Sequence, residues 1–112
     1  MPDSPAAPSR LPRHIGKYRV LARLGAGAVA ARYGGEEFAL VVPGVDTAAA
    51  AMVAERMRRA VREIAEPVTV SASFGVAAVP EDAAGVDEVI LAADAALLQA
   101  KALGRNRVVI SQ

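Results

Sequence analysis

The sequence predicts one small domain of the mixed α/β (α+β) class, in which helices pack on a β-sheet. Three patterns lead to this prediction. Apolar residues recur at helical spacing between residues 46 and 65, and apolar and polar residues alternate along Val68–Val79. Gly34 and Gly35 join two apolar segments, which is typical of an antiparallel hairpin. Helices and strands that follow one another in a chain of 112 residues fit a single layered domain.

The first half of the chain predicts a leader and three strands. Residues 1–14 are expected to form a flexible leader, since they are rich in proline and hold no apolar core of a signal peptide. Residues 18–24 alternate imperfectly and predict a strand, which the stretch Gly25–Ala28 ends. Two more strands, Val29–Tyr33 and Phe38–Val42, flank the Gly-Gly pair, whose positive φ angles suit a two-residue turn.

The second half predicts two helices and two strands. Asp46 or Thr47 suits the N-cap of a helix that runs to Ala65. Its apolar stripe consists of Ala50, Val53, Ala54, Met57, Val61 and Ile64. The arginines on its other side are predicted to be a solvated face, with a binding patch as the alternative. Strand Val68–Val79, a loop at Pro80–Gly85, a helix over Asp87–Leu103 closed by Gly104, and strand Arg107–Ile110 follow.

Composition excludes several classes of function. The chain is 54% hydrophobic and 22% charged, as expected for a globular protein, and much of the apolar content is Ala, which predicts a thin core. A net charge of +1 gives no reason to expect a nucleic-acid or membrane partner. Cysteine is absent and His14 is the single histidine, so any metal would be held by oxygen. A cytoplasmic location is expected.

Residues Arg32–Phe38 are the most informative stretch. Glu36 and Glu37 follow Gly34 and Gly35 at the predicted turn. Adjacent carboxylates suit Mg²⁺, which often bridges to substrate phosphates, and glycines leave room for a ligand to approach the backbone. The alternative is an ordinary turn with a solvated acidic rim.

This stretch resembles the signature of the GGDEF family of diguanylate cyclases, in the form with Glu at the third position. Three further stretches resemble family motifs in the same order: Val68–Ala77 is similar to "VTVSIGVA", Ala92–Lys101 to "ADxALYxAK", and Gly104–Val108 to "GRNRV". The resemblance covers residues 29–111, approximately.

The resemblance implies a sheet like the palm of nucleotidyl cyclases and the conversion of two GTP molecules into cyclic di-GMP with Mg²⁺ or Mn²⁺. It also implies a homodimer, or pairing with another GGDEF domain. Glu36 and Glu37 would be the catalytic and metal-binding acids, Gly34 and Gly35 would lie against the nucleotide, and Lys101 and Arg105 would bind phosphate. For these two cations the alternative is pairing with the C-terminus of a helix.

The sequence departs from the family pattern in its first half. The family strand "DxDxFKxxND" and the preceding helix "DxLTxLxNR" have no counterpart, and the inhibitory Arg-x-x-Asp site falls on Gly25–Ala28. We therefore expect a truncated domain that is inactive alone. The alternative is a non-enzymatic remnant that binds nucleotide or mediates dimerisation.

Residues 15–28 resemble the start of a bacterial Ser/Thr protein kinase, where a strand leads into a Gly-rich loop. The chain would then divide into a leader at 1–14, a kinase-like segment at 15–28 and a truncated GGDEF domain at 29–112. The junction between the last two would be either natural or an artefact of the gene model. The kinase lysine and catalytic aspartates have no counterpart, so a kinase-derived ATP-binding piece is the weakest interpretation. Residues 18–24 could instead fill the place of the missing strand.

Overall fold

The structure is a computed structural model that describes residues 13–23, 28–33, 37–64 and 70–112. The chain divides into two compact units, residues 1–43 and 44–112, and each is described by itself. The mixed α/β class predicted from the sequence is confirmed: the first unit carries a four-stranded antiparallel sheet, and the second carries two helices and a small parallel sheet.

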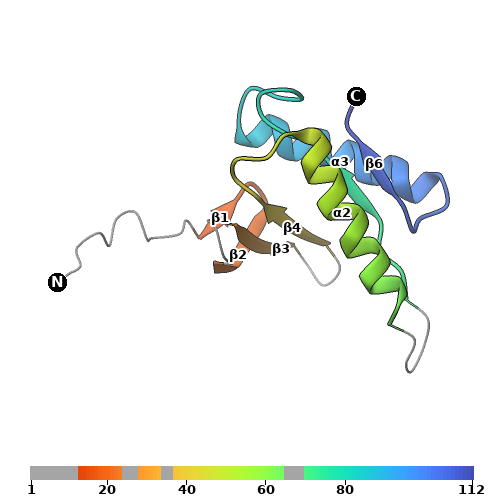
Figure 1. Ribbon diagram of the computed structural model, residues 1–112. Helices are drawn as coiled ribbons and strands as arrows, with labels where there is room; N and C mark the ends of the chain where they lie inside the picture. Colours follow the sequence, from red (N-terminus) through yellow and green to blue (C-terminus); the bar gives the residue numbers. More distant parts are fainter. Residues whose placement is uncertain (1–12, 24–27, 34–36, 65–69) are drawn as a thin grey trace. The chain divides into compact units, whose positions relative to one another are not determined.

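The sheet of the first unit has its strands in chain order (Figure 1). They are β1 His14–Ile15, β2 Tyr18–Arg23, β3 Val29–Tyr33 and β4 Glu37–Val41. The predicted hairpin is confirmed, because β3 and β4 pair antiparallel from Val29–Val41 to Tyr33–Glu37. This innermost pair encloses three residues, 34–36, rather than the two expected of a Gly-Gly turn. These three lie outside the described residues.

Strand β2 confirms the strand predicted at residues 18–24 and pairs antiparallel with β3. The pairing register shifts between Val20 and Ala22. Tyr18 and Ala31, on these two neighbouring strands, are buried. The segment for which we noted a kinase resemblance therefore supplies a strand of the same sheet as the hairpin.

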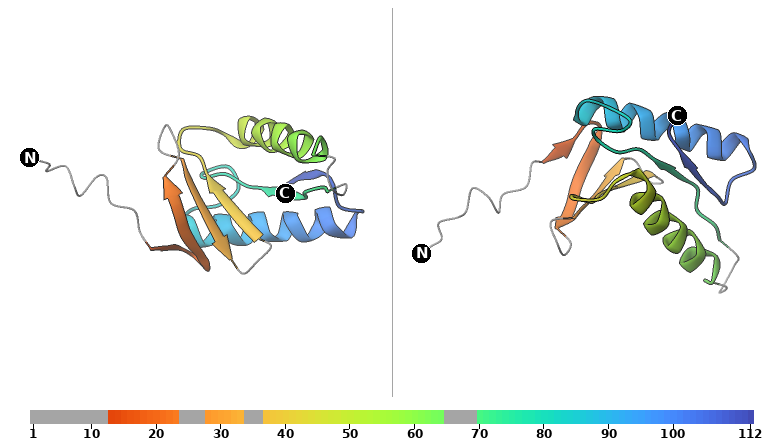
Figure 2. Two further views of the ribbon diagram at one scale, coloured as in Figure 1. Left: turned by 90° about the horizontal axis from the view of Figure 1, so that it is seen from below. Right: turned by 45° about the horizontal axis from the view of Figure 1, so that its top comes forward.

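The second unit is a three-layer arrangement. Figure 2 shows helices α2 (Thr47–Arg62) and α3 (Val86–Ala102) on opposite faces of a parallel pair of strands, β5 (Phe74–Val76) and β6 (Val108–Ile110). Parallel strands are usually covered by helices on both faces, and this pair follows the rule. A sheet of only two strands has marginal stability in water, so the helices supply most of the stabilising contacts.

Local signals place both predicted helices, although α2 ends at Arg62 and so before the predicted end at Ala65. The Asp46 carboxylate accepts a hydrogen bond from the backbone N–H of Ala49 at 2.8 Å and so caps α2. Gly104 follows the end of α3 with a φ of +119°, a conformation that favours glycine. The predicted stripe of α2 is only partly buried: Ala54 is buried, whereas Met57 and Ile64 are exposed.

The strand predicted over Val68–Val79 is much shorter than expected. Within the described residues, only Phe74–Val76 pair as a strand, and 70–73 do not. The partner β6 sets this length, because its register runs from Phe74–Val108 to Val76–Ile110. Residues 68 and 69 lie outside the described residues.

The core of the second unit is built from small side chains. Its buried apolar residues are Ala54, Val76, Ala78, Ala96 and Ala100, and no large side chain is fully buried in the described part of the chain. Gly75 shows how close the layers are: a Cβ there would overlap the backbone of Ala93 and Leu97 in α3. The thin core expected from the Ala-rich composition is confirmed.

Candidate functional site

The predicted site residues fall into three groups. Gly34, Gly35 and Glu36 lie outside the described residues. Glu37 belongs to the first unit, whereas Lys101 and Arg105 belong to the second. The structure therefore shows the surroundings of Glu37 and those of the two cations separately.

Glu37 begins strand β4 and is held by Tyr18, the first residue of β2, and by Lys17 in the turn before it. Its Oε1 atom accepts a hydrogen bond from the Tyr18 hydroxyl at 3.3 Å and lies 3.6 Å from the Nζ of Lys17. The Lys17 ammonium also lies 5.5 Å from the centre of the Tyr18 ring. The Glu37 side chain is 29% exposed. A cation, a phenol and a carboxylate thus gather around the Glu37 side chain.

The donor chemistry here fits a hard cation, because Mg²⁺ prefers carboxylate oxygen. Glu37 supplies one such group, and Glu36 precedes it in the sequence. A metal ion at Glu37 would compete with the Lys17 ammonium for the same oxygen. No group of three or more His, Asp or Glu side chains that could hold a metal occurs among residues 13–23, 28–33, 37–64 and 70–112.

Lys101 and Arg105 lie at the C-terminal end of α3. Lys101 is half-buried in the last turn, and Arg105 is exposed in the turn that follows. Two backbone hydrogen bonds close the helix there: Gly104 N to Lys101 O at 3.3 Å, and Arg105 N to Ala100 O at 2.9 Å. Cations at this end interact favourably with the helix dipole, and they are also suited to phosphate oxygens.

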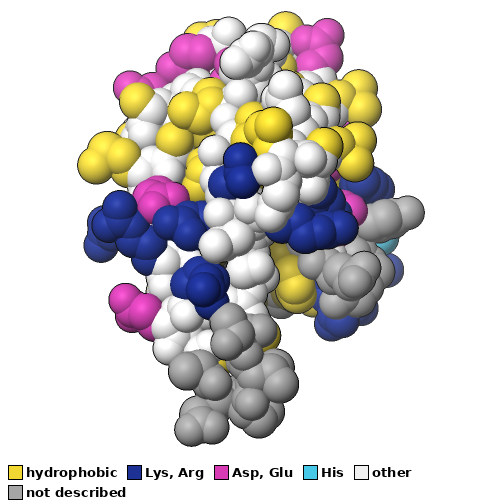
Figure 3. All heavy atoms as spheres, turned by 90° about the vertical axis from the view of Figure 1, so that its right-hand side faces the viewer, with side chains coloured by type: hydrophobic (Ala, Val, Ile, Leu, Met, Phe, Trp, Pro, Cys, Tyr) yellow, Lys and Arg dark blue, Asp and Glu magenta, His cyan; other side chains and the backbone are white. Residues whose placement is uncertain are grey.

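Apolar side chains lie exposed on the surface. Figure 3 shows many of them, in yellow, toward the top of the view. The exposed apolar residues of α3 include Leu91 and Leu98, each about two-thirds exposed.

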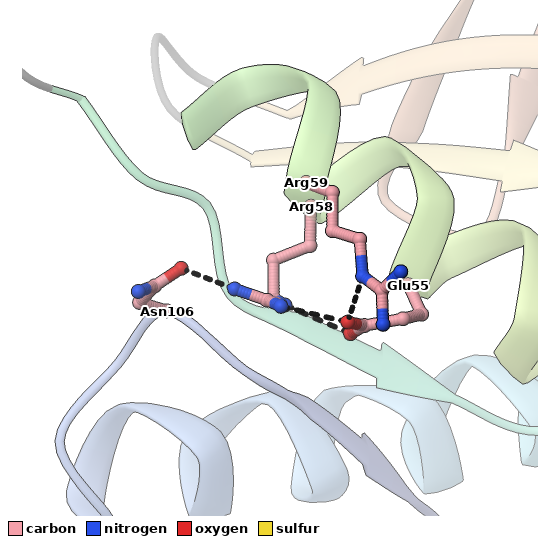
Figure 4. Close-up of polar contacts among 4 residues, drawn as sticks. All are labelled: Glu55, Arg58, Arg59 and Asn106. Carbon is pink, nitrogen blue, oxygen red and sulfur yellow. Dashed lines mark hydrogen bonds and ion pairs between the residues drawn. The ribbon is translucent and has the colours of Figure 1, made fainter. Parts of the chain in front are cut away.

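Sequence reasoning missed one set of contacts. Figure 4 shows Arg58 of α2 between Glu55 on the same helix and Asn106 in the turn before β6. Arg58 donates to both carboxylate oxygens of Glu55, at 2.8 and 2.7 Å, and to Oδ1 of Asn106 at 2.9 Å. Hydrogen bonds from Arg58 and then Arg59 lower the pKa of the Glu55 carboxyl to about 2.

The prediction of a solvated arginine face is therefore wrong for Arg58, whose side chain is only 20% exposed, and right for Arg59, at 71%. One sequence signal was available. Arg58 stands one helical turn after the buried Ala54, so it faces the same side as the apolar stripe.

The model of the family described as "Diguanylate cyclase, GGDEF domain" matches residues 17–107. The chain belongs to the GGDEF family. This GGDEF domain is 39% identical over 88 residues to diguanylate cyclase A of Treponema denticola, a match that covers 74% of this chain and 24% of the relative. It is 40% identical over 87 residues to the probable diguanylate cyclase DgcT of Escherichia coli, covering 71% of this chain and 19% of that protein.

A third relative is the bifunctional diguanylate cyclase/cyclic di-GMP phosphodiesterase MucR of Pseudomonas aeruginosa. It is 38% identical over 95 residues, which cover 79% of this chain and 13% of the relative. The GGDEF domain thus spans a quarter or less of the length of these relatives.

The family match begins at residue 17 and includes most of the segment 15–28. The kinase resemblance noted there finds no support in these comparisons. Among the described residues of the GGDEF domain, no helix has both the length and the apolar character needed to cross a membrane.

Proposed function

We propose that this GGDEF domain binds GTP together with Mg²⁺ or Mn²⁺, as the substrate complex of the diguanylate cyclase reaction, in which two GTP molecules give cyclic di-GMP. It would act paired with a second GGDEF domain, as a homodimer or with a different partner, and in the cytoplasm. The observation that carries the proposal is the placement of Lys101 and Arg105 together at the closed end of α3, in a chain that belongs to this family.

The roles follow from the chemistry of each group. Lys101 and Arg105 would bind phosphate oxygens through charge-assisted hydrogen bonds. Gly34 and Gly35 would allow the backbone to lie along the nucleotide. Glu36 and Glu37 would hold the metal ion, whose contribution when bound is to neutralise phosphate charge and to favour attack by the 3′-hydroxyl of the other GTP.

The ion pair at Glu37 fits this proposal. With Lys17 at 3.6 Å, the carboxylate keeps a positive neighbour when no metal is bound. A divalent ion brings more charge than an ammonium group, so it is able to displace Lys17 from the carboxylate. Lys17 would then turn toward other anionic groups.

We further propose that the chain alone binds GTP without turning it over. The sequence contains no counterpart of the family strand "DxDxFKxxND", which supplies a second metal-binding acid and groups that read guanine. The same lack favours the second candidate, a non-enzymatic module for nucleotide binding or dimerisation. The division at residue 28 and the kinase-like origin of residues 15–28 stay predictions.

Titration calorimetry with GTP and Mg²⁺ tests the binding step. Lys101→Ala and Arg105→Ala should each weaken GTP binding about tenfold, since each removes a charged hydrogen-bond partner. Arg59→Ala, which removes an exposed arginine of α2, should leave the affinity unchanged. If neither Lys101→Ala nor Arg105→Ala alters the affinity, the phosphate site is elsewhere.

A product assay tests the second step and the acidic residues. Incubation of the chain with GTP and Mg²⁺ should give no cyclic di-GMP. Glu36→Ala and Glu37→Ala should remove the dependence of GTP affinity on Mg²⁺. Formation of cyclic di-GMP that either substitution abolishes would show instead that the chain is an active cyclase.

A further inference from the structure

Three successive residues after α3 have positive φ angles: Gly104 at +119°, Arg105 at +63° and Asn106 at +50°. Glycine adopts such angles readily and asparagine tolerates them, but arginine does so rarely. A backbone in this region persists only where its surroundings hold it. The turn formed by residues 104–106 therefore depends on the contacts around it.

Among the hydrogen bonds that hold this turn, three connect it to different parts of the second unit. The Arg105 N–H donates to Ala100 O at the end of α3, at 2.9 Å. The Asn106 N–H donates to the hydroxyl of Ser73, just before β5, at 3.0 Å. The third comes from α2, where Arg58 donates to the side-chain oxygen of Asn106 at 2.9 Å. Of the three, the bond from Arg58 has a charged donor and is expected to be the strongest.

Arg58 is itself held in place. Its Nε and Nη2 donate to the two oxygens of Glu55, so the planar guanidinium is fixed by a two-pronged contact (Figure 4). The remaining nitrogen, Nη1, is the one that reaches Asn106. Glu55, Arg58 and Asn106 thus form a continuous connection from α2 to the turn.

We propose that Arg58 is a positioning residue, which holds Asn106 and thereby fixes the turn that presents Arg105, beside Lys101, to the triphosphate of GTP. The inference rests on the proposed function for the role of Arg105, and it goes beyond that function by giving a role to a residue on a different helix. Arg58 acts through the backbone of the turn and makes no phosphate contact itself.

The first test compares two neighbouring arginines in the full chain. Arg58→Met keeps the aliphatic stem and removes the guanidinium. Arg59→Met is the matched control, because Arg59 also bonds Glu55 but only Arg58 has a hydrogen bond to Asn106 among the contacts of the described residues. Calorimetry with inorganic triphosphate should show about tenfold weaker binding for Arg58→Met, the loss of one charged contact. Arg59→Met should stay within about twofold; equal losses would overturn the proposal.

A second comparison separates positioning from general stability. If Arg58 acts through Arg105, then Arg58→Met should not weaken triphosphate binding further in an Arg105→Ala background, whereas its effect on the melting temperature should persist. Asn106→Gly provides an independent route, since it removes the acceptor and relieves the φ strain. It should weaken triphosphate binding as much as Arg58→Met does. An undiminished effect of Arg58→Met in the Arg105→Ala background would overturn the proposal.

Amide hydrogen exchange measured by NMR gives a readout that needs no ligand. The amides of Arg105 and Asn106 should exchange faster in Arg58→Met than in Arg59→Met. If the unsubstituted chain fails to bind triphosphate, the proposed function falls, and this exchange rate still decides whether Arg58 holds the turn. Unchanged exchange in Arg58→Met would overturn the inference by itself.

Discussion

Adding one methyl group at Gly75 should destabilise the second unit strongly. Gly75 lies in the middle of β5, and a Cβ there would overlap the carbonyl oxygen of Ala93 and the backbone nitrogen of Leu97 and would lie 2.9 Å from the Cα of Leu97. These are backbone atoms of α3, so no side chain can rotate away. The helix has to retreat from the strand, and the contacts of its buried alanines weaken with it.

The expected change in stability for Gly75→Ala has the opposite sign to that of most Gly→Ala substitutions. Gly→Ala in an extended strand commonly stabilises a protein by about 0.4–1 kcal/mol, because alanine has less freedom to lose on folding. Overpacking a close contact costs about 1–3 kcal/mol, and the upper end applies where backbone atoms collide. We therefore expect a net loss of about 2 kcal/mol for Gly75→Ala. For a unit of this size that corresponds to a melting temperature roughly 8–16 °C lower.

Thermal and urea denaturation, followed by circular dichroism, measure this loss. Gly85→Ser is the matched control: apart from its chain neighbours, no residue comes within 4 Å of a Cβ at Gly85, and the residue is the N-cap of α3 without a side-chain hydrogen bond. Serine there should leave stability unchanged or raise it by about 0.5 kcal/mol. A Gly75→Ala protein as stable as the parent would refute the close contact between β5 and α3.

Two further substitutions test the helix α2. Asp46→Ala removes the cap bonded to Ala49 and should lower the free energy of unfolding by about 1 kcal/mol, measured by urea titration; a change under about 0.3 kcal/mol would contradict the capping role. For Glu55 the pKa is lowered from 4.5 to about 2, so its stabilising contribution is present above pH 4.5 and is lost as the pH falls through about 2. Glu55→Gln should flatten the fall in urea midpoint over this range, and parallel curves for the two proteins would contradict that assignment.

The fold was predictable where the residues that determine a helix or strand lie within that element or next to it in the sequence. Helix α2 begins after Asp46 because the aspartate caps it, and α3 ends before Gly104 because glycine tolerates the positive φ there. The hairpin was predictable from two apolar segments flanking a glycine pair. Strand β5 was not, since alternation shows that a segment can be a strand but not how many residues its partner offers.

The candidate site was predictable in chemistry but not in geometry. The residue types and their motifs named Glu37, Lys101 and Arg105, whereas nothing local to Glu37 indicates that Lys17 and Tyr18 reach it from another strand. The hydrogen bond from Arg58 to Asn106 joins residues 48 positions apart in the sequence, and no periodicity in the sequence indicates such a contact. The roles of all six predicted site residues stay predictions, those of Glu37, Lys101 and Arg105 included.

The close packing between β5 and α3 determines which substitutions this layer accepts. In a core filled by leucine and phenylalanine, one large side chain can be replaced by another, and the harmful substitutions are those that leave cavities. Here Gly75 lies against the backbone of α3, and the buried residues of that helix are Ala96 and Ala100, so little volume is available to lose. The harmful substitutions are those that enlarge a residue. Substitutions at this layer are therefore confined to the smallest amino acids.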